Sequence, residues 1–166
     1  MPELAVRAGT ATDLPAINDI YNHYVLHTAI TFEVEPVTMT ARRRWFEQYA
    51  PHGRHRLLVA ADGDHPLGYA TSSRYQPRAA YETSVEVSVY VDPDAVGRGL
   101  GTMLYAALLA ALEPEDVHRA YGGIALPNAA SVALHECFGF RRVGYFTEQG
   151  RKFGRYWDVA VYERSL

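Results

Sequence analysis

Several large protein classes are excluded by what the sequence has little of. Cys137 is the only cysteine among 166 residues, so neither an internal disulfide nor a cysteine-built metal site can form. No apolar run approaches the ~20 residues needed to span a bilayer, and the first residues lack the basic and apolar regions of a signal peptide. The net charge of −3 provides no general field for nucleic acid. We therefore expect a cytoplasmic protein that binds neither membrane nor nucleic acid.

The composition that remains is that of an ordinary globular protein. Hydrophobic residues make up 48% of the chain and charged residues 21%, which argues against disorder. No repeat, low-complexity tract or long linker marks a boundary, so we expect one domain over residues 1–166. Basic clusters occur at residues 42–44, 141–142 and 151–155, and we expect them to be solvated surface.

Strand-like and helix-like segments alternate, which predicts a layered α/β (α+β) fold. The apolar patterns predict helices at residues 14–24, 38–49, 100–111 and 128–138. They predict strands at residues 4–8, 56–61, 67–75, 85–91, 120–126, 143–146 and 156–162, the second and third of these as a hairpin.

Three alternating glycines, Gly97, Gly99 and Gly101, lie between the strand at 85–91 and the helix at 100–111. Glycine permits positive φ and a close approach to main-chain N–H groups, while a helix start supplies unpaired donors; the combination favours a phosphate or pyrophosphate. A dinucleotide-binding fingerprint requires a further glycine where Thr102 stands, and the Gly-Lys-Ser/Thr of a Walker loop is absent. A tight turn without a ligand is the remaining alternative.

The strand at 85–91 carries valines at its odd positions and Glu86, Ser88 and Tyr90 at its even ones. One face is therefore apolar and the other polar, as on any half-exposed strand. Because an anion-binding helix start follows directly, the polar face is also expected to line the cleft beside the anion. Glu86 is then a candidate general base.

On the helix at 128–138, Asn128, Ser131 and His135 recur at spacings of three and four, so they share one face. Asn128 is a good N-cap. A lone histidine on an otherwise apolar helix is commonly structural, whereas one at the edge of a cleft can donate a proton near neutral pH. Both interpretations of His135 stay open.

Together these segments resemble the GNAT superfamily of N-acetyltransferases, most closely its phosphinothricin acetyltransferase branch, over nearly the whole chain. The resemblance implies a mixed, mostly antiparallel sheet of six to seven strands with helices on both faces, acetyl-CoA as cosubstrate, no metal, and a homodimer. It rests on YNHY at 21–24, TFEVEP at 31–36, RAAY at 78–81, VEVSVYVDP at 85–93, GRGLGTMLY at 97–105, GGIALPNAASVALHECFGF at 122–140 and GRKFGRYWDV at 150–159.

By this resemblance the glycine turn holds the pyrophosphate of acetyl-CoA. Main-chain amides from Gly97 to Thr102, including Leu100, would point at the phosphates, and Arg98 would add charge. The family pattern begins with Gln or Arg where this chain has Val96, which removes one side-chain contact. The strand at 85–91 would splay from its neighbour and leave main-chain groups of Val89 and Val91 to pair with the pantetheine arm, which Asn128 and Ser131 would also contact.

The same resemblance assigns the chemistry. Glu86 would deprotonate the acceptor amine, and a main-chain N–H near Tyr90 or Val91 would stabilise the oxyanion. His135 stands where many relatives carry Tyr, and its role as acid, base partner or structural residue is not separable from sequence.

The acceptor is expected to be a small, anionic amine. Arg78 and Tyr81 precede the strand that carries Glu86, and a guanidinium suits a carboxylate or phosphinate. Phe32 would form an apolar wall, and Arg74 and Lys152 are weaker candidates, with a plain surface location as the alternative. The resemblance implies an acceptor of the phosphinothricin, methionine sulfoximine or methionine sulfone type. Because the branch commonly has Trp-Thr where this chain has Thr83 and Ser84, acceptors other than phosphinothricin are also expected, such as methionine sulfoximine, methionine sulfone or another amino acid.

Two alternative functions remain. One is acetylation of protein N-termini, which would require an open peptide groove. The other is a non-catalytic acyl-CoA-binding domain, against which the presence of both Glu86 and His135 argues.

Overall fold

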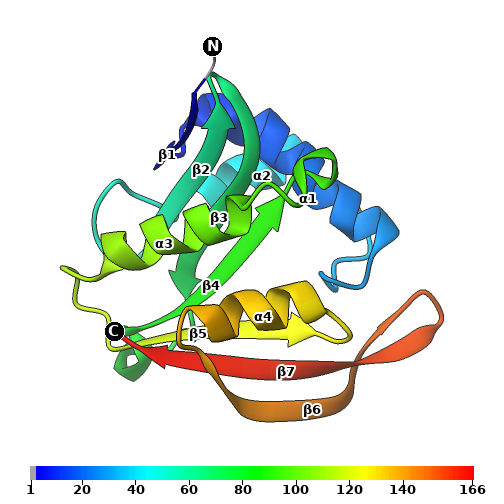
Figure 1. Ribbon diagram of the computed structural model, residues 1–166. Coiled ribbons are helices and arrows are strands. Elements are labelled where there is room, and N and C mark those ends of the chain that lie inside the picture. Colours follow the sequence, from blue (N-terminus) through cyan, green and yellow to red (C-terminus); the bar gives the residue numbers. More distant parts are fainter. Residues whose placement is uncertain (1–2) are drawn as a thin grey trace.

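A seven-stranded sheet runs through the computed structural model, which describes residues 3–166 (Figure 1). Its order is β1-β2-β3-β4-β5-β7-β6, and β4 and β5 form the parallel pair between antiparallel neighbours. The strands are β1 (Leu4–Ala8), β2 (Arg56–Asp62), β3 (His65–Arg74), β4 (Ser84–Val91), β5 (Arg119–Ala125), β6 (Arg141–Lys152) and β7 (Arg155–Ser165).

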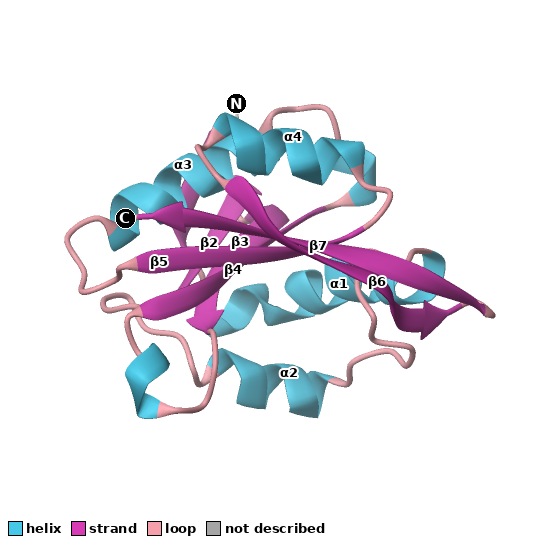
Figure 2. Ribbon diagram, turned by 90° about the horizontal axis from the view of Figure 1, so that it is seen from below, coloured by secondary structure: helices cyan, strands magenta, loops and turns pink. Residues whose placement is uncertain are grey.

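Helices cover both faces of this sheet: α1 and α2 lie on one side, α3 and α4 on the other (Figure 2). The helices are α1 (Leu14–His27), α2 (Met39–Phe46), α3 (Leu100–Leu112) and α4 (Ala129–Cys137). Within residues 3–166, none of them combines the length and the apolar character that crossing a membrane would require.

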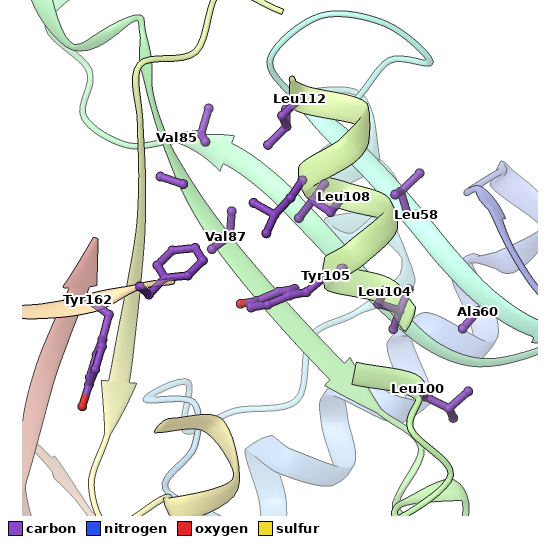
Figure 3. Packing of buried hydrophobic residues seen from close by; sticks show 14 of the residues in the cluster. Leu58, Ala60, Val85, Val87, Leu100, Leu104, Tyr105, Leu108, Leu112 and Tyr162 are labelled. Carbon is purple, nitrogen blue, oxygen red and sulfur yellow. The ribbon is translucent and has the colours of Figure 1, made fainter. Parts of the chain in front are cut away.

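Each face of the sheet has its own apolar core. Leu104 and Leu108 of α3 are fully buried. They belong to one core cluster with Val87 of β4 and Leu58 of β2 (Figure 3). On the other face Ile17 of α1 packs with Tyr69 of β3. Truncating one such leucine to alanine costs about 2–5 kcal/mol, so α3 is firmly seated and its first turn is held in place relative to β4.

The strands β4 and β5 separate after a short stretch of pairing. Their register joins residues 84–86 to residues 119–121, and beyond that point the two strands diverge (Figure 1). On the opposite edge β4 stays paired with β3, and the Asp92 N–H donates to the Leu67 carbonyl (2.8 Å). Because hydrogen-bonding direction alternates along an antiparallel strand, the main chain of Tyr90 faces β3. The main-chain groups of Val89 and Val91 face the opening.

The predicted fold class, the order of the elements and the splayed strand are confirmed. Other expectations were wrong, among them the length of one strand and the exposure of one arginine. The strand expected at 143–146 extends over Arg141–Lys152, because it pairs with β7 through two irregularities in register. Arg42, expected on the surface with its neighbours, is 3% exposed.

Candidate functional site

The glycine turn between β4 and α3 has the geometry of an anion site. Gly97 and Gly99 have φ of +86° and +75°, and a Cβ at either position would meet no atom within 4 Å. Gly99 is the N-cap of α3 and offers no side chain to the first amide groups. Those N–H groups therefore remain available to a ligand, at the positive end of the helix dipole.

A cavity of about 630 Å³, which we call the glycine-turn cavity, opens beside this turn. It lies between α3, the splayed end of β4 and the start of α4. Apart from Arg98, the residues expected to bind the coenzyme line it: Val89, Tyr90, Val91, Gly97, Gly99, Leu100, Gly101, Thr102, Asn128 and Ser131. The guanidinium of Arg98 lies 3.9 Å from a carboxylate oxygen of Asp62, and its contact with the phosphates stays a prediction. The long, open shape and exposed amides fit a nucleotide with a flexible arm.

The directions of the N–H groups in β4 distinguish the two predicted oxyanion donors, Tyr90 and Val91. The Tyr90 N–H faces β3, so the Tyr90 alternative is wrong and Val91 remains. The Val91 carbonyl accepts a hydrogen bond from the Tyr24 hydroxyl (2.5 Å). The groups left for a ligand are thus the N–H of Val91 and the main chain of Val89.

A second cavity of about 790 Å³, the glutamate cavity, lies on the other face of β4, toward α1 and α2. The polar side chains of β4 enter it, as their alternation predicted: Glu86, Ser88 and Tyr90 all line it. Phe32 lines it from the loop after α1, as expected. Ile30 and Tyr90 line both this cavity and the glycine-turn cavity, so the two spaces are adjacent at β4.

The carboxylate of Glu86 has the electrostatic character of a general base. Burial raises its pKa above the ordinary 4.5, and no cation contributes to the shift. The Glu86 side chain is exposed to the open cavity, but neighbouring atoms still remove part of the water around its carboxylate and no ion pair offsets this loss, so it holds a proton more readily than a freely solvated glutamate. It lies within the glutamate cavity, where an amine can approach it.

His135 is buried and lines neither of the two large cavities. It is 3% exposed; its Nδ1 donates to the Ser131 carbonyl (2.7 Å), which leaves Nε2 to accept from the Tyr105 hydroxyl (3.0 Å). A Cβ on Gly122 would come within 2.6 Å of Nε2. Burial lowers the pKa of His135, so the ring is neutral at pH 7. These contacts favour the structural alternative, although the ring also borders a small cavity of about 50 Å³ below Ser131.

The basic residues expected around the acceptor do not line the glutamate cavity. Arg74 is exposed, as its alternative predicted, and its guanidinium donates to the carbonyls of Gln76 and Pro77. Arg78 caps the short turn Ala79–Tyr81, and the exposed Tyr81 ring packs edge-on against Tyr75. Their roles in binding the acceptor stay predictions.

Lys152 is 4% exposed, so the surface alternative for it was wrong. Its Nζ donates to the carbonyl of Thr31 (2.8 Å) and does not reach into the glutamate cavity. It therefore holds the loop that carries Phe32.

Sequence reasoning missed Arg42, which lines the glutamate cavity. Its guanidinium lies 4.8 Å from the ring centre of Tyr21 and 4.4 Å from that of Trp45, and Nε donates to Asn18 Oδ1 (3.0 Å). Its buried Nη2 has no hydrogen-bond partner among residues 3–166. Helical spacing offered a signal, because position 42 lies three residues before Trp45 on the apolar stripe of α2.

Among residues 3–166, no three His, Cys, Asp or Glu side chains gather closely enough to hold a metal ion.

Comparisons with known proteins agree with this geometry. Residues 6–161 match the family model described as an acetyltransferase (GNAT) domain. A phosphinothricin N-acetyltransferase of Streptomyces coelicolor is 57% identical over 99% of this chain and 97% of its own length. An L-methionine sulfoximine/L-methionine sulfone acetyltransferase of Pseudomonas paraeruginosa is 36% identical over 98% of this chain and 94% of its own length.

A solved structure extends the likeness to three dimensions. It is a phosphinothricin acetyltransferase of Sinorhizobium meliloti in complex with acetyl-CoA, with a TM-score of 0.93 and 31% identity over 98% of this chain and 88% of that one. With its two cavities adjacent at a splayed β4, the chain belongs to the GNAT family of acetyltransferases.

Proposed function

We propose that this protein is a single-domain, acetyl-CoA-dependent N-acetyltransferase. Its acceptor is the α-amino group of a small anionic amino acid or analogue of the phosphinothricin, methionine sulfoximine or methionine sulfone type. The names of the two relatives reported above describe acetyltransferases that act on such compounds. The observation that carries the proposal is that the glycine-turn cavity and the glutamate cavity are adjacent at Tyr90, with Glu86 on the acceptor side.

The glycine-turn cavity would bind the coenzyme, which supplies an activated acetyl thioester. The amides from Gly97 to Thr102 hold the pyrophosphate, and main-chain groups of Val89 and Val91 pair with the arm as a neighbouring strand would. Asn128 and Ser131 flank that arm at the start of α4. The gap between β4 and β5 thus guides the acyl end toward Tyr90.

Glu86 would accept the proton of the acceptor ammonium, directly or through a water molecule, leaving the amine able to attack. The Val91 N–H faces the opening, where it can donate to the oxygen that becomes negative. A free thiol has a pKa of about 8.5, so the departing thiolate needs little help from an acid. Arg42 is the cation that lines the acceptor space, while Arg78 remains a second candidate for the acceptor's carboxylate.

The proposal includes a homodimer in the cytoplasm. Large apolar side chains stay 46–57% exposed on β6, β7 and their turn, an area that a second copy would cover: Val143, Tyr145, Phe146, Phe153 and Tyr156. A cytoplasmic location fits because acetyl-CoA is available there.

A panel of free amino acids and their sulfoxide, sulfone, sulfoximine and phosphinate analogues tests the proposal, with release of free coenzyme thiol as the assay. We expect turnover with small anionic members and none with a peptide that presents a free N-terminus. Preference for the peptide would identify an N-terminal acetyltransferase instead. Binding of acetyl-CoA without transfer to any amine would identify a non-catalytic binding domain.

A further inference from the structure

The apolar wall of the glutamate cavity rests on a glycine in a distant part of the chain. The ring of Phe32 lies directly against Gly150 of β6. A Cβ built on Gly150 would come within 2.2, 2.5 and 2.6 Å of Cε2, Cδ2 and Cζ of that ring. Because φ of Gly150 is not in the left-handed region, its backbone does not require glycine. Glycine is required at this position because the Phe32 ring fills the space that a side chain would occupy.

The residue before Phe32 is held from two sides. Thr31 is 8% exposed; its Oγ1 is hydrogen-bonded to the hydroxyl of Tyr21 on α1 (2.7 Å), and its carbonyl accepts from Lys152 Nζ (2.8 Å). Helix α1 and strand β6 therefore fix the loop at the point where the ring enters the cavity.

The amine of Lys152 is costly to hold in this position. The side chain is 4% exposed, and burial lowers its pKa. Removing an ammonium group from water is unfavourable. The charge of Glu33 offsets part of this effect on the pKa, but no salt bridge to Lys152 forms among residues 3–166. Its carbonyl contact joins β6 to the acceptor loop, which is about 120 residues earlier in the chain.

We propose that Gly150 and Lys152 are positioning residues that set the acceptor specificity of the enzyme through Phe32. The inference rests on the function proposed above and adds the element that shapes the acceptor space. Gln149, next to Gly150, also lines the glutamate cavity, so this part of β6 forms its wall together with the ring. Neither Phe32 nor Gly150 lines the glycine-turn cavity, so coenzyme binding is separate from this contact.

Gly150→Ala tests the proposal. The new methyl group forces the Phe32 ring from its place, and a displacement of about 1 Å near a reacting group can lower the rate about a hundredfold. We expect kcat/KM for the preferred amino acid to fall by about tenfold to a hundredfold, mainly through KM for the acceptor. The affinity for acetyl-CoA, measured by calorimetry, should stay within about twofold of wild type.

A second substitution identifies the cause. Phe32→Leu removes the ring that the methyl group would strike, so Gly150→Ala should cost less than about threefold in that background, as a double-mutant cycle measures. Gly144→Ala is the matched control on β6, because its Cβ would lie 3.6 Å from Val161, an ordinary contact. An equal loss from Gly150→Ala in both backgrounds, or no loss in wild type, would overturn the proposal.

If Gly150→Ala does not fold, Lys152→Met provides a second test of whether the loop contact controls acceptor binding. It keeps the buried length and removes the contact with Thr31, so we expect a raised acceptor KM with unchanged acetyl-CoA affinity; unchanged KM in a folded protein would contradict the proposal. The proposed function fails separately, when wild-type protein acetylates no amino acid in the panel.

Discussion

Replacing Glu86 with glutamine removes the charge of the proposed base and keeps its shape. No cation contributes to the pKa of the Glu86 carboxylate, so the substitution breaks no ion pair and little else should change. Loss of a general base typically lowers the rate about 10²- to 10⁴-fold, or about 3–5 kcal/mol in transition-state stabilisation. We therefore expect kcat/KM for the acceptor to fall by that factor at neutral pH, with acetyl-CoA binding unchanged.

The pH dependence of activity should report the ionisation of Glu86. Glu86 must be ionised to accept a proton, and burial raises its pKa above 4.5. Activity of the wild type should therefore fall as the pH drops toward that raised value, and the fall should begin at a higher pH than an exposed glutamate would give. This limb should be absent from Glu86→Gln.

The substitution Glu86→Gln should lower activity without lowering the stability of the folded protein. A carboxyl group whose pKa is raised on folding binds more protons in the native state, so its contribution to stability falls as pH rises from 4.5 through the raised value. Glu86→Gln removes this penalty, and its melting temperature at neutral pH should equal or exceed that of wild type.

Thiol release under saturating acetyl-CoA is the assay, and Glu35→Gln, which changes another glutamate that lines the same cavity, is the matched control. Undiminished turnover of Glu86→Gln at neutral pH, or an equal loss in Glu35→Gln, would refute the assignment of Glu86 as the base.

Three further predictions concern His135 and Arg78. Tyr105→Phe leaves the buried Nε2 of His135 without its donor, so the free energy of unfolding should fall by about 1–3 kcal/mol in denaturant titrations; an unchanged value would contradict the structural role. Because burial lowers the pKa of His135, wild-type stability should decrease as pH falls below 6.5, and less so in His135→Asn, as thermal unfolding would show. If Arg78 pairs with the acceptor's carboxylate, Arg78→Ala should raise KM about tenfold or more for acceptors that carry an α-carboxylate and leave amines without one unaffected; equal effects on both would assign that role elsewhere.

The sequence predicted the parts of the site that depend on local pattern. Alternation along β4 placed Glu86, Ser88 and Tyr90 on one face, and the glycine spacing predicted a turn in which Gly97 and Gly99 take positive φ. Both follow from short-range geometry, which one segment of chain determines by itself.

The parts that were missed depend on contacts between distant segments. Lys152 meets Thr31 through a separation of 121 residues, and nothing near either residue indicates the contact. His135 was placed on the correct helix face, but whether that face meets the cleft or the interior depends on Tyr105 and Gly122. Arg42 was expected at the surface because arginine is rarely buried, and its aromatic neighbours come partly from α1.

Calorimetric titration with acetyl-CoA measures directly whether the amides of the glycine turn hold the coenzyme. Gly99→Ala creates no clash, since nothing lies within 4 Å, but places alanine at a φ of +75°, which costs roughly 1–2 kcal/mol. Gly53→Ala is the control, because Gly53 has a φ of +89° and lies outside both cavities. We expect saturable binding to wild type, a loss of affinity of about tenfold or more in Gly99→Ala, and no loss in Gly53→Ala. Equal affinity in all three proteins, or no binding to wild type, would contradict this expectation.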